Sequence, residues 1–225
     1  MSSLMNFARL ALDNIDRYGE YVFLKYEDRE FTNTGLEKLF NRFSRGLQKR
    51  GMQKGDRVIV FLPNMPEVLI SYQAILRAGA IIVPVNPSLS YHELSYIITD
   101  SEASIVITAQ GLFETVQAAK EHSPVKPVII TVGTDLPEGS ISFEDCYAED
   151  DTFLMFDQPD DAVAIIMYTS GTTGKPKGVM LSHLNIRMEG YGDSQQIGLI
   201  DSDGNRILDK INMICVLPFC HVYGL

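Results

Sequence analysis

Apolar positions in the first fifty residues follow the period of a helix, then of a hairpin, then of a second helix. Apolar residues at helical spacing predict an amphipathic helix over residues 4–17. Two runs rich in aromatic and β-branched residues, 21–26 and 30–32, flank a polar turn and predict a β-hairpin. A second amphipathic pattern follows the hairpin and ends at Gly51, as expected for a helix with a glycine beyond its last turn.

Two pairs of hydroxyl and carboxylate residues have the spacing of helix capping boxes. Thr34 with Glu37 predicts the start of the second helix, and Ser90 with Glu93 predicts the start of a later one. In a capping box, each side chain accepts a hydrogen bond from the backbone N–H group of the other residue. These pairs therefore predict where the two helices begin.

From residue 57 onward, short apolar runs alternate with helical patterns. Continuous apolar runs of this length are typical of strands that are buried on both faces of a parallel sheet. The sequence therefore predicts the α/β fold class, with layered, mostly parallel sheets and helices on both faces. The expected strands are 57–62, 80–85, 104–108, 127–132, 162–168 and 212–217.

A stretch without basic residues divides the chain. Between Pro127 and Gly174 there are ten acidic residues and no Lys or Arg, which is more typical of a solvated connection than of a cation site. We therefore expect residues 1–160 to form an N-terminal α/β subdomain that ends in this acidic connection. Residues 161–225 are expected to begin a second, truncated α/β subdomain, with a Gly-rich loop and a helix that starts near Ser182.

Composition and charge exclude several classes of protein. A chain with 45% hydrophobic and 21% charged residues can bury a core, which argues against a disordered or disulfide-stapled chain. The formal charge of -10 argues against a nucleic-acid partner. No apolar run reaches the roughly 18 residues that a membrane span requires, so no transmembrane segment is expected. Three widely spaced cysteines without a CxxC pair indicate a reducing compartment, and a cytoplasmic location is expected.

The densest group of chemically useful residues follows the strand expected at 162–168. Residues 168–178 read Tyr-Thr-Ser-Gly-Thr-Thr-Gly-Lys-Pro-Lys-Gly. The glycines allow close backbone approach, while hydroxyl groups and backbone N–H groups can donate hydrogen bonds to phosphate oxygens. Two lysines add positive charge in a chain that is otherwise acidic. The loop is therefore predicted to bind phosphate.

Two common nucleotide-binding motifs do not fit this loop. The P-loop of phosphoryl-transfer NTPases needs four residues between its glycines and a hydroxyl residue after the lysine, whereas Gly171 and Gly174 are too close and Pro176 follows the lysine. A dinucleotide fingerprint would need a Gly-x-Gly start, which is missing. A metal site built by the protein is not expected either, because three histidines lack partners at ligand spacing: His92, His122 and His183.

Taken whole, the loop resembles the phosphate loop of the adenylate-forming acyl-CoA synthetase family, the AMP-binding enzymes, and is most similar to fatty-acid or aryl-acid CoA ligases. In layout the resemblance covers essentially the whole chain. It implies the N-terminal part of the adenylate-forming enzyme fold. The other segments that carry the resemblance are Leu62-Pro63-Asn64 with Glu67, Gly79-Ala80 with Pro84-Val85-Asn86-Pro87, and Leu217-Pro218-Phe219-Cys220-His221-Val222-Tyr223-Gly224-Leu225.

The resemblance also implies a two-step reaction. A carboxylate attacks the α-phosphate of ATP to give an acyl-adenylate and pyrophosphate, and the thiol of coenzyme A then displaces AMP. ATP, Mg²⁺ bound with ATP, and coenzyme A as co-substrate are the implied cofactors. His221 would be catalytic and, with Tyr223, would bind the carboxylic acid, while Lys175 is a weaker candidate for phosphate binding. The residues implied to bind the phosphates are Thr169, Ser170, Gly171, Thr172, Thr173, Gly174 and Lys177.

The substrate and the extent of the chain lead to further expectations. Phe219 and Tyr223 favour an aliphatic or aromatic acid, and a fatty acid is expected. Because the chain stops after the His-x-x-Gly segment, we expect an N-terminal fragment that is inactive alone and self-associates through the apolar edge near residue 225. Two alternatives stay open: a non-catalytic nucleotide-binding or interaction module, and another adenylate-forming enzyme.

Overall fold

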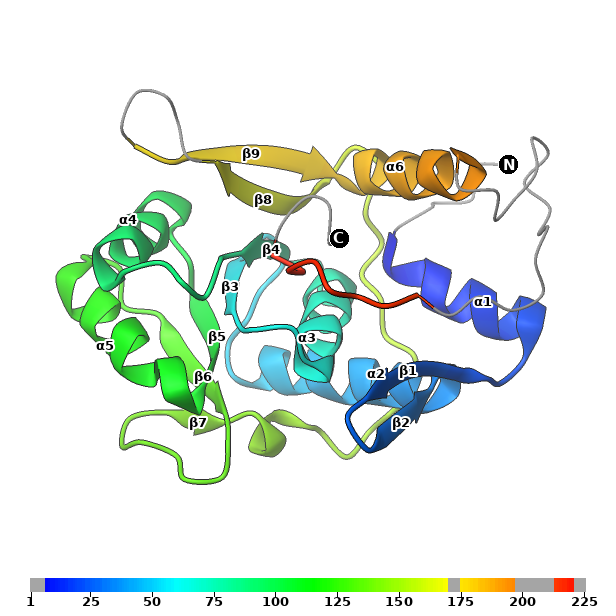
Figure 1. Ribbon diagram of the computed structural model, residues 1–225, viewed down its shortest axis with the longest axis horizontal. Helices are drawn as coiled ribbons and strands as arrows, with labels where there is room; N and C mark the ends of the chain where they lie inside the picture. Colours follow the sequence, from blue (N-terminus) through cyan, green and yellow to red (C-terminus); the bar gives the residue numbers. More distant parts are fainter. Residues whose placement is uncertain (1–6, 170–174, 197–212, 221–225) are drawn as a thin grey trace.

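A seven-stranded sheet forms the centre of the computed structural model, which describes residues 7–169, 175–196 and 213–220 (Figure 1). The strand order is β7-β6-β5-β3-β4-β8-β9. Neighbouring strands run parallel as far as β8, whereas β9 runs antiparallel to β8. The predicted α/β class is confirmed. The strands are β3 Arg57–Phe61, β4 Ile81–Pro84, β5 Ile105–Ala109, β6 Val128–Val132, β7 Ile141–Ser142, β8 Val163–Thr169 and β9 Lys177–Ser182.

Helices cover both faces of this sheet, and the strand residues alternate between two cores. Val58 and Val60 of β3 pack in the core shared with α2 and α3, whereas Ile59 and Phe61 pack in the core shared with α4 and α5 (Figure 1). Because both faces are buried, the strands carry continuous apolar runs, as predicted. The helices are α2 Asn33–Lys49, α3 Pro66–Arg77, α4 Tyr91–Ser101 and α5 Phe113–His122.

The N-terminal elements form a smaller unit beside α2. A two-stranded antiparallel sheet confirms the predicted hairpin. The helix expected over residues 4–17 is seen, within the described residues, as a short 3-10 turn followed by an α-helix. The elements are η1 Phe7–Arg9, α1 Leu10–Tyr18, β1 Val22–Tyr26 and β2 Arg29–Thr32.

One of the two predicted capping boxes is wrong. Helix α2 is capped by Thr32, whose Oγ1 accepts a hydrogen bond from the N–H group of Gly35 at 3.0 Å. The helix therefore begins at Asn33, and Thr34 lies in its first turn instead of at its cap. Glu37 is buried and serves a different purpose, described below.

The second predicted box, at the start of α4, is confirmed. The Oγ of Ser90 accepts from the backbone N–H of Glu93, and the Glu93 carboxylate accepts from the backbone N–H of Ser90. Hydrogen bonds from Ser90 hold the pKa of Glu93 below its ordinary value. The box therefore provides partners for backbone donors that a helix terminus would otherwise leave unsatisfied.

A buried ion pair joins α2 to α3. The guanidinium of Arg77 is fully buried and donates to both carboxylate oxygens of Glu37, at 2.5 Å and 2.8 Å, and to Oδ1 of Asn41 at 2.6 Å. It lies over the rings of Phe40 and Phe153, at 5.2 Å and 5.5 Å from their centroids. The bidentate geometry and the extra acceptor offset part of the cost of removing these charges from water.

The backbone of the acidic connection is bonded to α2, while most of its acidic side chains are exposed to solvent, as predicted. The side chains of Arg42 and Arg50 donate to the backbone carbonyls of Ala148 and Asp145, at 2.7 Å and 2.6 Å. A Cβ atom at Gly46 would overlap the carbonyl oxygen of Cys146, so glycine is needed for this close approach. Strand β7 and the short helix η3 (Glu144–Cys146), which the sequence pattern did not predict, belong to this connection.

Strands β8 and β9 extend the same sheet. Strand β8 joins β4 through the register pair Ile82 and Ile165, and helix α6, His183–Gln196, begins where the sequence predicts. Strand β9 was not predicted, and residues 213–217 form no strand, contrary to expectation. The sheet therefore continues past residue 161, and the division into subdomains at this point stays a prediction.

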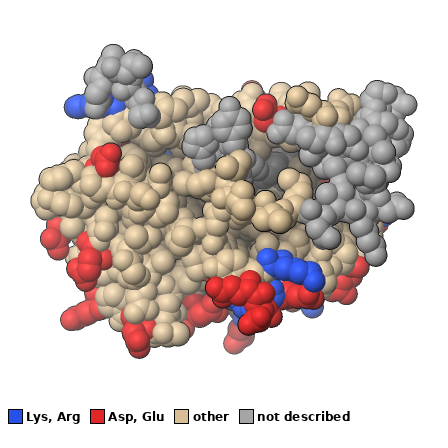
Figure 2. All heavy atoms as spheres, viewed as in Figure 1, with Lys and Arg blue, Asp and Glu red and all other residues tan. Residues whose placement is uncertain are grey.

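The charged surface is uneven on the face shown in Figure 2. Acidic side chains are frequent along the lower edge of this view, whereas basic atoms at the upper left lie near the described end of the β8–β9 hairpin. Among the described residues, no helix is long and apolar enough to cross a membrane.

Candidate active site

The β8–β9 hairpin brings together the two ends of the predicted phosphate loop. Thr169, the last residue of β8, is the register partner of Lys177, the first residue of β9. Both are predicted phosphate-binding residues, and the side chains of both are exposed. The other predicted loop residues, Ser170, Gly171, Thr172, Thr173 and Gly174, lie outside the described residues.

Local sequence explains how β8 holds this hairpin to the sheet. Ala164 and Ile165 are buried, and Ile165 pairs with β4. Toward the loop the strand becomes progressively exposed, from half-buried Tyr168 to exposed Thr169. The hairpin therefore starts in the core and ends at the surface, which is where a loop that binds a soluble phosphate must lie.

The tip of the hairpin also contacts the last turn of α4. The hydroxyl of Tyr168 donates to Oδ2 of Asp100 at 2.7 Å, and the hydroxyl of Tyr96 donates to Oδ1 of the same residue at 3.4 Å. Burial, and then the Asp100 carboxylate, raise the pKa of Tyr168, so its hydroxyl stays protonated and remains a donor. The ammonium of Lys175 lies 5.8 Å from the centroid of the Tyr96 ring. Of the two lysines, Lys175 therefore faces α4.

A second candidate region consists of residues 213–220, which lie against the start of α3 (Figure 1). The side-chain amide of Asn64 donates to the carbonyl of Leu217 at 2.8 Å and accepts from the N–H group of Phe219 at 2.9 Å. The hydroxyl of Tyr72 donates to the carbonyl of Phe219 at 3.0 Å. These bonds fix the backbone just before His221. Both His221 and Tyr223 lie outside the described residues.

Sequence reasoning missed the side chains that hold these two regions. Asn64 was part of a recognised segment, Leu62-Pro63-Asn64, but no role was inferred for it. Tyr72 gave no signal, because it occupies an apolar position of an amphipathic helix. Asp100 gave only a weak signal. A carboxylate in the last turn of a helix interacts unfavourably with the helix dipole, which indicates a local partner that stabilises it.

Other reactive groups are poorly placed for chemistry. Burial raises the pKa of the Cys146 thiol to about 11, so it is a weak nucleophile at neutral pH. Burial also raises the pKa of Cys220. Across residues 7–169, 175–196 and 213–220, no three His, Cys, Asp or Glu side chains are grouped so that they could hold a metal ion.

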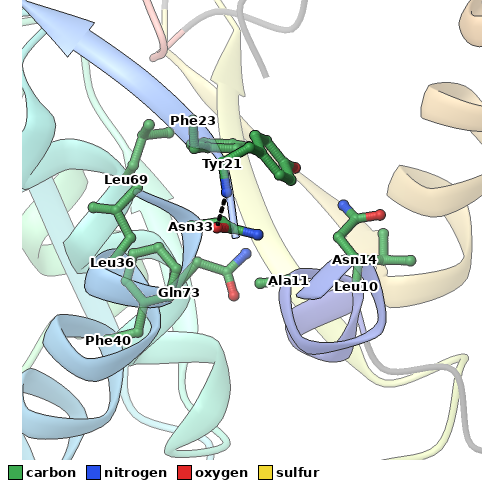
Figure 3. A pocket seen from close by; sticks show the side chains of 10 residues that line it. All are labelled: Leu10, Ala11, Asn14, Tyr21, Phe23, Asn33, Leu36, Phe40, Leu69 and Gln73. Atoms are coloured by element: carbon green, nitrogen blue, oxygen red, sulfur yellow. Dashed lines mark hydrogen bonds between the residues drawn. The ribbon is translucent and has the colours of Figure 1, made fainter. Parts of the chain in front are cut away.

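An apolar cavity of about 160 Å³ lies between α1, β1, α2 and α3 (Figure 3). Its polar lining groups include the amides of Asn14, Asn33 and Gln73, and Oδ1 of Asn33 accepts from the backbone N–H of Tyr21 (Figure 3). None of its lining residues carries a full charge, and none belongs to β8, β9 or residues 213–220. The cavity has no cationic group to balance the charge of a carboxylate or phosphate, so it is not the candidate site.

The fold is an α/β sheet with an antiparallel hairpin at its edge, and the predicted phosphate loop lies between the two strands of this hairpin in the sequence. The AMP-binding enzyme family matches residues 12–225. The chain therefore belongs to this family, and the resemblance recognised in its motifs is confirmed.

Individual relatives agree with this assignment. The chain is 35% identical over 205 residues to a long-chain-fatty-acid–CoA ligase of Bacillus subtilis, covering 80% of this chain and 36% of that protein. It is 31% identical over 210 residues to a crotonobetaine/carnitine–CoA ligase of Salmonella paratyphi A, covering 88% of this chain and 40% of that protein. The chain thus spans well under half the length of these relatives.

Solved structures show the same fold. Apo MatB from Rhodopseudomonas palustris superposes with a TM-score of 0.82 at 28% identity, covering 98% of this chain and 41% of that chain. The ATP-bound form of MatB gives a TM-score of 0.74 at 29% identity with the same coverage. The prediction that the chain corresponds to part of the adenylate-forming enzyme fold is confirmed.

Proposed function

We propose that the natural protein containing this chain is an AMP-forming acid–thiol ligase. It activates a carboxylic acid with ATP and transfers the acyl group to coenzyme A. The observation that carries the proposal is the pairing of Thr169 with Lys177, in a member of the AMP-binding family, because this pairing brings both ends of the phosphate-loop motif to one place.

In the first half-reaction, a carboxylate oxygen of the acid attacks the α-phosphorus of ATP. A bond forms between them, and the bond from the α-phosphorus to the bridging oxygen breaks, so the electron pair leaves with pyrophosphate. Positive charge and hydrogen-bond donors are needed where this negative charge develops. The proposed phosphate-binding residues are Thr169, Ser170, Gly171, Thr172, Thr173, Gly174 and Lys177.

In the second half-reaction, the thiol sulfur of coenzyme A bonds to the acyl carbon, the bond from that carbon to the phosphate oxygen of AMP breaks, and AMP and the thiol proton are released. His221 and Tyr223 are proposed to position the acid and the adenylate. The bonds from Asn64 and Tyr72 support this role, because they fix the chain two residues before His221. Mg²⁺ would enter bound to the ATP phosphates, where it would offset their charge.

A fatty acid is the proposed substrate. Phe219 packs against the main core and adds an aromatic side chain two residues before His221 in the sequence. The name of the Bacillus subtilis relative, a long-chain-fatty-acid–CoA ligase, supports the same class of acid. A cytoplasmic location is proposed because Cys146, Cys215 and Cys220 are all free thiols.

Self-association is a further part of the proposal. Several apolar side chains are strongly exposed, among them Met180 of β9 at 67%, and Ile214 and Val216 of residues 213–220 at 88% and 77%. Exposed apolar groups that lie together favour association. Sedimentation of the purified 225-residue chain over a range of concentrations tests this, and a monomer throughout would contradict it.

The test of function is ATP–pyrophosphate exchange with a panel of fatty and aromatic acids. We expect acid-dependent exchange by the natural gene product, strongest with fatty acids, and none by the 225-residue chain alone. Exchange by the chain alone would show that it needs no further residues. Tight ATP binding by the natural product without exchange for any acid would instead favour a non-catalytic nucleotide-binding module.

A further inference from the structure

The last turn of α4 carries a carboxylate that faces the phosphate-loop hairpin. Asp100 lies near the helix C-terminus, where the helix dipole disfavours negative charge, and this turn contains no basic residue. The side chain is exposed, so burial does not account for its contacts. Its nearest partners are instead two tyrosine hydroxyls.

The two hydroxyls connect Asp100 to different parts of the molecule. Tyr96 is four residues earlier on the same helix, and its contact of 3.4 Å is long. Tyr168 is 68 residues later, and its hydroxyl lies 2.7 Å from Oδ2. A short bond to a charged acceptor is among the stronger hydrogen bonds in proteins. Only the Tyr168 bond can restrain β8, and Tyr168 directly precedes Thr169.

The hairpin is shaped so that the Tyr168 side chain can lie over it. Tyr168 is the register partner of Gly178. A Cβ atom at position 178 would lie 3.3 Å from the Cζ atom of the Tyr168 ring and 2.8 Å from a methyl group of Ile166. A side chain at Gly178 would therefore force the Ile166 methyl group to shift and would press on the Tyr168 ring. A glycine at this position leaves the phenol free to reach α4.

We propose that Asp100 is a positioning residue for the phosphate loop. By accepting a hydrogen bond from the Tyr168 hydroxyl, Asp100 holds the Thr169 end of the hairpin against α4. This restraint raises the affinity of the loop for the β- and γ-phosphates of ATP. The inference rests on the proposed function, which assigns Thr169 and Lys177 to those phosphates. Asp100 acts through Tyr168 and need not touch the nucleotide.

Kinetics of the natural gene product separate positioning from simple structural support. Tyr168→Phe and Asp100→Ala should each raise KM for ATP about five- to tenfold, the loss expected for a partly exposed hydrogen bond to a charged group. Thioester formation from preformed adenylate should be unchanged, because the pyrophosphate has already left. Asp100→Asn keeps a neutral acceptor and should fall between wild type and Asp100→Ala. The double variant should be no worse than the worse single variant.

Tyr96→Phe is the matched control. It removes a hydroxyl from the same carboxylate but keeps the ring beneath Lys175, and that hydroxyl does not connect α4 to the hairpin. We expect its KM for ATP to equal that of wild type. Equal effects of Tyr96→Phe and Tyr168→Phe would overturn the inference, as would a KM for ATP in Tyr168→Phe that matches wild type.

Failure of the proposed function can be told apart from failure of this inference. If the wild-type protein shows neither ATP–pyrophosphate exchange nor ATP binding, the proposed function is wrong. The proposed role of Asp100 in ATP binding is then wrong too. Amide hydrogen exchange then tests the contact itself: Tyr168→Phe should speed exchange at 163–169 and 177–182, and Tyr96→Phe should not. Unchanged amide hydrogen exchange in Tyr168→Phe would show that the bond to Asp100 does not restrain the hairpin.

Discussion

The centre of the sheet and its β8–β9 edge are held together in different ways. Strand β3 is buried on both faces, so its stability comes from apolar packing in two cores. Strand β9 is exposed for most of its length. The Tyr168 end of the β8–β9 hairpin is held by a hydrogen bond to Asp100, and residues 213–220 are held by hydrogen bonds with Asn64 and Tyr72. Substitutions at the centre should therefore change stability, and substitutions at the edge should change ligand binding.

The largest expected effect lies at the centre. Arg77→Met should lower the free energy of unfolding by about 3–5 kcal/mol, because it leaves Glu37 buried without its partner. Urea denaturation measures the loss. The matched control is Arg9→Met, which breaks an exposed pair with Asp13 and should cost less than about 1 kcal/mol. Similar losses in the two variants would contradict the importance of burial.

The second effect lies at the edge. Lys177→Ala should slow adenylate formation by the natural gene product about 100-fold, because it removes a charge that is proposed to meet the departing pyrophosphate. Thioester formation from preformed adenylate and the urea midpoint should change little, since Lys177 is exposed. Rapid-quench assays of each half-reaction provide the measurement.

Lys175→Ala is the comparison for this variant. Lys175 lies over the Tyr96 ring, so its loss should slow adenylate formation less than the loss of Lys177. Equal slowing of both half-reactions by Lys177→Ala would argue against its role in holding pyrophosphate.

The same division explains what the sequence could predict. Strands such as 57–62 were readable because apolar packing on both faces leaves a continuous apolar run. The phosphate loop was readable because its glycines, hydroxyls and lysines are adjacent in the chain. The bond between Asp100 and Tyr168 was not, because the fold brings together residues 68 positions apart. Glu37 was misread as a cap because its true partner, Arg77, is 40 positions away.

A third prediction concerns two buried tyrosines. Burial raises the pKa of Tyr72, whose hydroxyl donates to Phe219, and of Tyr147, which packs on Phe43. Above about pH 10 these side chains lose protons in the unfolded chain but keep them in the folded one. The free energy of unfolding should therefore be unaffected by these tyrosines below about pH 10. Above that pH it should fall by about 1.4 kcal/mol per pH unit for each tyrosine.

Urea titrations between neutral pH and about pH 11 measure this slope. Tyr72→Phe should reduce the slope by the contribution of one proton, and Tyr147→Phe should do the same. An unchanged slope in both variants would show that these tyrosines do not control the alkaline loss of stability.

The smallest expected effect is at the opposite end of α4 from Asp100. Ser90→Ala removes the capping box and should lower the free energy of unfolding by about 1 kcal/mol. Because the side chain of Ser90 bonds to Glu93 of the same helix, far from the Asp100 end, KM for ATP should stay at the wild-type value. Ser90→Thr keeps a capping hydroxyl and should recover most of the stability.

Ser90→Ala and Asp100→Ala together test the comparison within a single helix. If the N-terminus of α4 stabilises the fold and its last turn positions the hairpin, Ser90→Ala should change the urea midpoint. Asp100→Ala should change KM for ATP. Because a helix is a cooperative unit, one observation would remove this separation: a raised KM for ATP in Ser90→Ala that Ser90→Thr restores. In that case the loop would depend on the stability of the whole helix and not on the Asp100–Tyr168 bond.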